Sequence, residues 1–115
     1  MNHLNDITNT YYEYVSKVSQ GCIVISNLFR ETQINEGISN LLNFIEGFEG
    51  LVKIEQFMIE NGYFINSRLA EANEFLNEIT EALEVQDYTL IADLFEYEIV
   101  PLFSSASEWV FIKNK

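Results

Sequence analysis

Basic residues are scarce in this 115-residue chain, and one long stretch has none. The chain carries 18 acidic and 6 basic residues, a net charge of −12, and no lysine or arginine lies between Arg68 and Lys113. Binding to phosphates requires a basic patch, so this composition argues against nucleic acid and anionic membrane surfaces as partners. A protein partner with a basic surface fits the charge better.

Histidine and cysteine are nearly absent, since only His3 and Cys22 occur. Their scarcity excludes zinc sites built from Cys and His, and also the paired Glu-x-x-His motifs of di-iron bundles. The apolar neighbours of Cys22 predict a small buried side chain. No Walker loop, dinucleotide fingerprint or Gly-x-Ser-x-Gly elbow is present, so we expect no cofactor and no enzymatic activity.

A long hydrophobic run is also missing. The most apolar stretch, Leu51 to Ile59, is short and contains Lys53 and Glu55, so we expect no transmembrane segment. The N-terminus lacks the positive and apolar regions of a signal peptide. A cytoplasmic location is therefore expected.

The chain does contain enough apolar material for one folded domain over residues 1–115, with 48% hydrophobic and 14% aromatic residues. Apolar residues recur every three or four positions over four segments, approximately 6–31, 36–60, 68–85 and 87–109. Short links between them predict an all-α protein, an antiparallel up-down four-helix bundle. Pro101 falls inside the last segment, where the apolar phase continues to Trp109. This pattern predicts one last helix that is kinked at Pro101.

Most carboxylates point away from this predicted core. On the third segment they repeat every three or four residues opposite the apolar stripe, which indicates a solvated face or a docking face for a basic partner. Glu55 and Glu98 are exceptions, because each falls within an apolar sector. We expect both to face the core, where a hydroxyl from Tyr11 or Tyr14 could satisfy such a carboxylate.

The last segment also carries the candidate interaction surface. Asp87 is placed to cap the helix. Asp93 and Glu96 lie one turn apart on its outer side, with Tyr97 nearby. Capping explains Asp87. A structural role explains Asp93, Glu96 and Tyr97 less well, so we expect a protein partner to dock there.

One enzymatic alternative stays open. All-α nucleotide pyrophosphatases hold magnesium with acids one helical turn apart on two helices, and Glu46-x-x-Glu49 and Glu71-x-x-Glu74 have this form. Magnesium prefers such oxygen ligands together with substrate phosphates. Glu-x-x-Glu also recurs at Glu78 and Glu81, as chance predicts in so acidic a chain.

The segment from Ala82 to Leu102 contains Gln86-Asp87-Tyr88, Ala92-Asp93-Leu94, Glu96-Tyr97-Glu98 and Pro101. It resembles the "QDY…LADLLEYE…P" pattern of the last helix in a family of small uncharacterised proteins from spore-forming Gram-positive bacteria. The resemblance implies a cytoplasmic helical protein, and it allows an export-chaperone or adaptor role. Our leading interpretation is a non-enzymatic protein-binding, adaptor or chaperone-like module. Such a module could also form a homodimer. The magnesium-dependent nucleotide hydrolase is the alternative.

Overall fold

A computed structural model describes residues 3–114 of the chain. Its principal helices and strands, in chain order, are α1 (His3–Arg30), α2 (Ile34–Glu60), β1 (Tyr63–Ile65), α3 (Leu69–Glu84), α4 (Tyr88–Leu94), α5 (Val100–Ser104) and β2 (Phe111–Lys113). A π-helical turn, η1 (Phe95–Ile99), joins α4 to α5, and a 3₁₀ turn, η2 (Ala106–Glu108), follows α5. The prediction of a mostly helical protein is confirmed, whereas the two short strands were not predicted.

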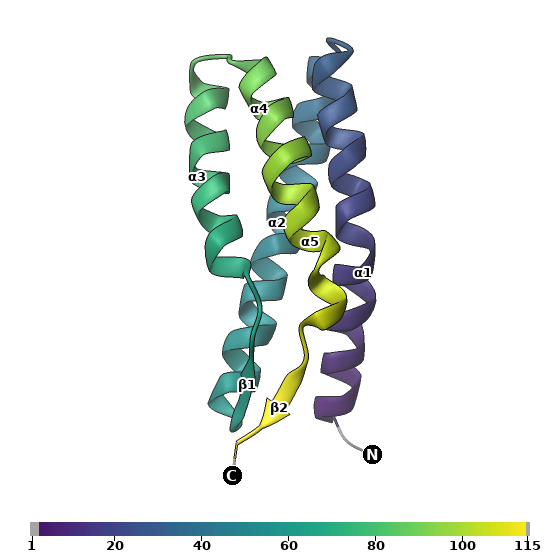
Figure 1. The fold of residues 1–115 in the computed structure, drawn as a ribbon, viewed down its shortest axis with the longest axis vertical. Helices are drawn as coiled ribbons and strands as arrows, with labels where there is room; N and C mark the ends of the chain where they lie inside the picture. The colour runs from purple at the N-terminus through teal and green to yellow at the C-terminus, as the bar shows by residue number, and fades with distance from the viewer. Residues whose placement is uncertain (1–2, 115) are drawn as a thin grey trace.

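The helices lie side by side along an elongated body of 49 × 22 × 20 Å. Figure 1 shows α1 rising, α2 descending, β1 and α3 rising, and the stretch from α4 to α5 descending, so that the start of α1 and the end of β2 both lie at the lower end. α1 packs against α2, α4, η1 and α5. α1 therefore connects α2 with the last helical stretch, from α4 to α5.

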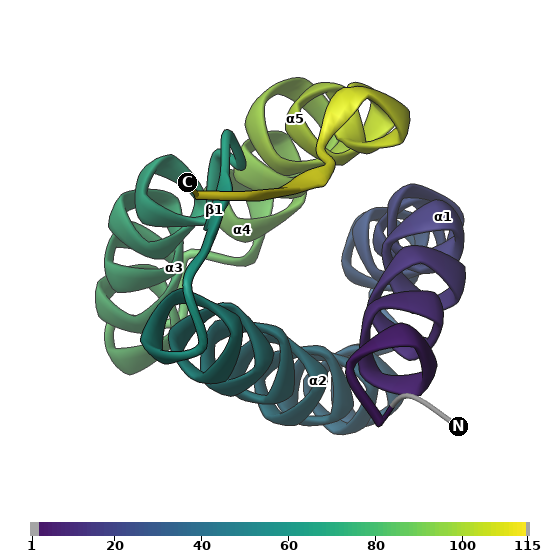
Figure 2. The ribbon, with the colours of Figure 1, turned by 90° about the horizontal axis from the view of Figure 1, so that it is seen from below.

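The core lies between these helices, which surround it when the molecule is seen along its length (Figure 2). α1 contributes a buried residue at every third or fourth position, from Tyr11 through Val18, Cys22 and Ile25 to Phe29. This is the spacing of one helix face. Cys22 is buried and unpaired, as predicted, and burial raises the pKa of its thiol.

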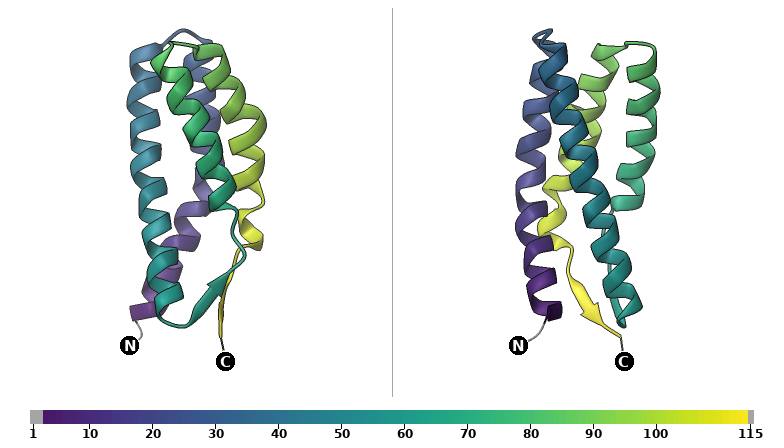
Figure 3. Two further views of the ribbon diagram at one scale, coloured as in Figure 1. Left: turned by 90° about the vertical axis from the view of Figure 1, so that its left-hand side faces the viewer. Right: turned by 180° about the vertical axis from the view of Figure 1, so that it is seen from behind.

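The two strands close the lower end of the molecule. α3 has 16 residues against 27 in α2, and β1 and β2 occupy the space below it (Figure 3). The strands pair antiparallel, with Phe64 opposite Ile112. Phe111 of β2 packs its ring 4.9 Å from the ring of Tyr11, measured between centroids. The strands therefore attach the end of the chain to α1.

The last helical stretch differs from the single helix that the sequence predicts. It continues through Pro101 but ends at Ser104, and Trp109 has an extended backbone. Before the proline, the Val100 N–H donates to the Phe95 carbonyl five residues back, which defines the π turn. Proline supplies no N–H and crowds the carbonyl of residue i−4, so a wider turn directly before it is a favourable accommodation.

Candidate functional site

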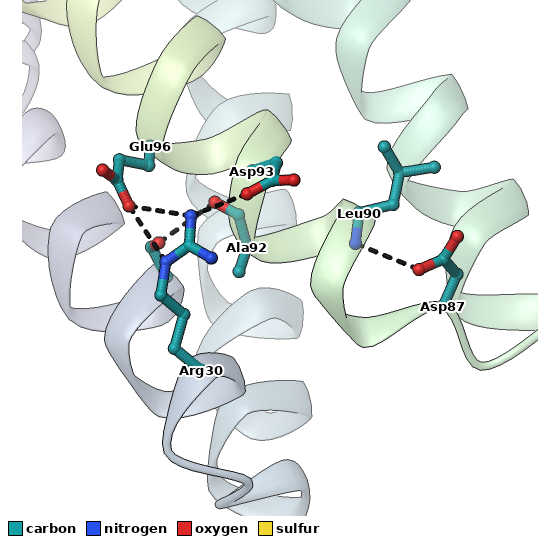
Figure 4. Close-up of polar contacts among 7 residues, drawn as sticks. Arg30, Asp87, Leu90, Ala92, Asp93 and Glu96 are labelled. Carbon is teal, nitrogen blue, oxygen red and sulfur yellow. Dashed lines mark hydrogen bonds and ion pairs between the residues drawn. The ribbon is translucent and has the colours of Figure 1, made fainter.

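The candidate site lies where the end of α1 meets α4 and η1. Arg30 reaches across from α1, and its Nη2 donates to Asp93 Oδ1 at 2.8 Å while its Nε donates to Glu96 Oε1 at 3.0 Å (Figure 4). These hydrogen bonds, first that to Asp93 and then that to Glu96, raise the pKa of Arg30. One guanidinium is thus shared by two carboxylates, which leaves the cluster with a net charge of −1.

The cluster is accessible to solvent. The side chains of Arg30, Asp93 and Glu96 are 34%, 45% and 44% exposed. Exposed ion pairs contribute little to folding, because water and salt screen them. The three side chains can therefore exchange partners without disturbing the core.

Beneath this cluster, a buried contact joins α1 to the same stretch of helix. The hydroxyl of Ser26 donates to the carbonyl oxygen of Ala92 at 3.0 Å, and Ser26 is 2% exposed. Ala92 lies three residues before η1 begins, where the helical ladder widens. The serine supplies a donor to that carbonyl and fixes the height of α4 relative to α1.

Tyr97 lies within η1 and projects outward. Tyr97 is 62% exposed, more than any other aromatic residue in the described part of the chain. It follows Glu96 directly and comes four residues after Asp93. The three residues of the predicted interaction surface therefore all come from one short stretch, although Arg30 neutralises part of its charge.

The prediction that Glu98 faces the core is wrong, because Glu98 is exposed. A regular α-helix would rotate Glu98 by about 20° from the direction of the buried Ile91, well within the apolar sector. The π turn needs more residues per revolution, so it brings Ile99 to the core instead and leaves Glu98 at the surface. Asp87 does cap α4 as predicted, since its Oδ1 accepts from the Leu90 N–H at 3.1 Å (Figure 4).

Glu55 faces inward, as the sequence predicts, and is partly buried. The Tyr11 hydroxyl donates to Glu55 Oε2 at 2.5 Å, and Tyr11 itself is fully buried. Burial, together with this hydrogen bond, raises the pKa of Tyr11. Tyr14, the other expected donor, instead places its hydroxyl against Gly47, where a Cβ would overlap it.

The four acids of the magnesium alternative are not gathered into a site. Glu46, Glu49, Glu71 and Glu74 are all exposed. Over residues 3–114, no three His, Cys, Asp or Glu side chains converge so that they could hold a metal ion. Arg68 donates two hydrogen bonds to Glu71 and lowers the pKa of that carboxyl, so Glu71 already has a protein cation as its partner.

Arg30 is the site residue that sequence reasoning missed. It lies at the last position of α1, 63 residues before Asp93. The available signal was compositional, because so few basic residues occur that each would be expected near several carboxylates. The partner could not be chosen among 18 acids without the packing of α1 on α4.

The structure thus defines a helical protein with a shared-arginine acidic cluster at an interhelical seam. The chain belongs to the family described as "Domain of unknown function (DUF8042)", whose model matches residues 6–108. No curated protein and no solved structure matches the chain. Among the described residues, no helix has both the length and the apolar character that crossing a membrane demands.

Proposed function

We propose that this protein is a non-enzymatic protein-binding module, of adaptor or chaperone-like type, that docks a basic segment of a partner protein. The docking surface is the acidic face, which we define as Asp93, Glu96 and Tyr97. The observation that carries the proposal is the exposure of Tyr97, at 62%, directly beside two carboxylates that share a single arginine.

Charge complementarity supports a basic segment as the partner. The cluster retains a net negative charge, and no lysine or arginine occurs at positions 69–112 to compensate it. An arginine of the partner would meet a carboxylate, which it binds in a bidentate manner, and an aromatic face, on which it stacks. Stacking of this kind contributes about 0.5–1 kcal/mol at exposed sites.

The conformation of the local backbone also supports a binding role for this surface. Residues 95–99 form a π turn, a feature that is rare and that often occurs at functional sites. Tyrosine is enriched in protein interfaces because its ring gives a large contact area with few rotatable bonds. The π turn that accommodates Pro101 thus also presents an exposed tyrosine, which supports recognition at this surface.

The test is a quantitative pull-down from lysate of the source cells, followed by calorimetry with the captured partner. Asp93→Lys/Glu96→Lys reverses both charges and is expected to weaken binding at least tenfold, with a reduced dependence on salt. Glu74→Lys/Glu78→Lys is the matched control, since it makes the same change in charge at two exposed acids of α3. If the Asp93/Glu96 variant captures the same partners with equal affinity, the partner does not dock on the acidic face.

The hydrolase alternative has its own discriminating measurement. Thermal melting is recorded with magnesium and nucleoside triphosphates, each at increasing concentration. A ligand at 100 times its dissociation constant stabilises a protein by about 2.7 kcal/mol. We expect no such shift, and a saturable one would overturn the binding-module proposal.

A further inference from the structure

A second feature lies away from the acidic face, in a cleft of about 400 Å³ between α1 and the end of the chain. Its floor includes Val15 of α1, Phe103 of α5 and Trp109. Ligand pockets in proteins typically have volumes of 300–1,000 Å³ and largely apolar walls with a few polar groups. The cleft has the size and lining of a small-molecule site.

None of the ten residues that line the cleft is charged, although the chain carries 18 acidic and 6 basic residues. Four of the ten are serines, and Tyr12 is another hydroxyl residue. A cation would find no carboxylate in the wall. An anion would find no basic residue there and would be repelled by the net charge of −12. The lining therefore suits an uncharged molecule.

The unpaired indole N–H of Trp109 also points to a ligand, independently of the size and lining of the cleft. Trp109 is only 2% exposed, and its indole Nε1–H has no hydrogen-bond acceptor within the described chain. Over the same residues, no fully buried side-chain nitrogen or oxygen lacks a partner. The Nε1–H is therefore among the atoms of Trp109 that reach the surface, and Trp109 lines the cleft.

Other donors of the cleft are similarly unused. Tyr12 accepts the Phe111 N–H at 2.9 Å, which leaves its own hydroxyl proton free. The hydroxyls of Ser19 and Ser107 make no hydrogen bond to residues 3–114. Each hydroxyl can donate one proton. The serine and tyrosine hydroxyls can also accept a hydrogen bond, whereas the Trp109 Nε1–H can only donate, so a ligand that accepts a hydrogen bond satisfies a group of the cleft that has no partner.

We propose that this cleft binds a neutral, partly aromatic small molecule that carries a carbonyl-type acceptor. The carbonyl accepts from the Trp109 Nε1–H, and the aromatic body packs on Phe103 and Val15. The proposal does not depend on the acidic face, because the cleft and that face share no residue.

The first test uses two neutral fluorescent probes that differ mainly in the acceptor. Prodan is a naphthalene with a ketone and a dimethylamino group, whereas 2-(dimethylamino)naphthalene lacks the ketone. Trp109 is the only tryptophan, so its emission reports on occupancy of the cleft. We expect prodan to quench Trp109 saturably at one molecule per chain, and to bind about three- to tenfold more tightly than the ketone-free probe, which corresponds to one hydrogen bond.

Two variants locate the binding, with prodan emission as the readout. Trp109→Phe keeps an aromatic ring but removes the N–H, and should weaken prodan about three- to tenfold while leaving the ketone-free probe unchanged. Ser19→Leu fills the cleft and should abolish binding of both probes. Ser39→Leu, at an exposed position of α2 outside the cleft, is the control, and circular dichroism checks that each variant is folded.

Three results would overturn the proposal. The first is the absence of saturable prodan binding to the wild-type protein. The second is an unchanged affinity in folded Ser19→Leu, which would place the probe elsewhere. The third is equal affinity of the wild-type protein for the two probes, which would remove the role of the carbonyl.

Discussion

Helix α1 makes two contacts with distant carboxylates, and the two contacts differ in burial. Near the start of the helix, fully buried Tyr11 donates to Glu55 at 2.5 Å. At its last residue, Arg30 binds Asp93 and Glu96 with 34–45% of each of the three side chains exposed. The first contact replaces hydration that the fully buried Tyr11 cannot regain in the folded protein. The second leaves every group in reach of water.

This difference separates a structural role from the binding role proposed above for the same type of side chain. Removing one partner of a buried pair leaves the other without a hydrogen bond, at a cost of about 1–3 kcal/mol. An exposed carboxylate whose partner is removed is simply hydrated. The Arg30 cluster can therefore accept an arginine from another protein, whereas the contact between Tyr11 and Glu55 cannot be exchanged.

The largest effect is expected for Tyr11→Phe, which removes the donor to Glu55. We expect the free energy of unfolding at pH 7 to fall by about 1–3 kcal/mol, because Glu55 is partly buried and keeps no other side-chain donor within residues 3–114. Urea unfolding measures the change. Tyr14→Phe is the control, and its effect should be small because Tyr14 is 39% exposed. Equal effects of the two substitutions would contradict the structural role of the buried contact.

The same pair has a signature at alkaline pH. Burial and the bond to Glu55 raise the pKa of Tyr11. Above about pH 10 the unfolded chain loses this proton and the folded chain keeps it, so the stabilisation is complete below pH 10 and declines as pH rises. The difference in stability between wild type and Tyr11→Phe should therefore narrow by about 1.4 kcal/mol per pH unit there. Cys22 is present in both proteins, so its own raised pKa cancels.

Much of the fold could be predicted because the helices have regular apolar spacing. The second and third segments begin and end within two residues of their expected positions. The fourth begins within one residue of its expected start, where Asp87 caps α4. The inward direction of Glu55 followed from the same periodicity. These features depend on local geometry, which one sequence specifies well.

The features that were missed depend on departures from that geometry or on distant packing. The strands are three residues each, too short to show alternation, and they form only because residues 63–65 meet residues 111–113. The π turn changes the helical phase without a sequence signal other than Pro101, which is why Glu98 was misplaced. The partner of Arg30 required the packing of α1 on α4.

An intermediate effect on the free energy of unfolding is expected for Ser26→Ala. This variant tests whether a buried contact next to the acidic cluster contributes more to stability than an exposed one. The variant leaves the Ala92 carbonyl without the hydroxyl at 3.0 Å, and should lower the free energy of unfolding by about 0.5–1.5 kcal/mol. Ser16→Ala is the matched control on α1, because exposed Ser16 donates only to the backbone carbonyl of Glu13. If chemical denaturation gives the same change for both, the buried hydroxyl does not fix α4 on α1.

The smallest effect is expected for Glu98→Gln, and this variant tests the comparison where sequence and structure disagree. The burial of a core-facing Glu98 would make the effect of the substitution on stability depend on pH. At the exposed position that the π turn gives it, the substitution should change the free energy of unfolding by no more than about 0.5 kcal/mol. Melting curves of both proteins between pH 3 and pH 7 are the measurement. A difference that exceeds 1 kcal/mol and varies with pH would place Glu98 in the core, and it would mean that the last helix keeps a regular α-helical phase up to Pro101.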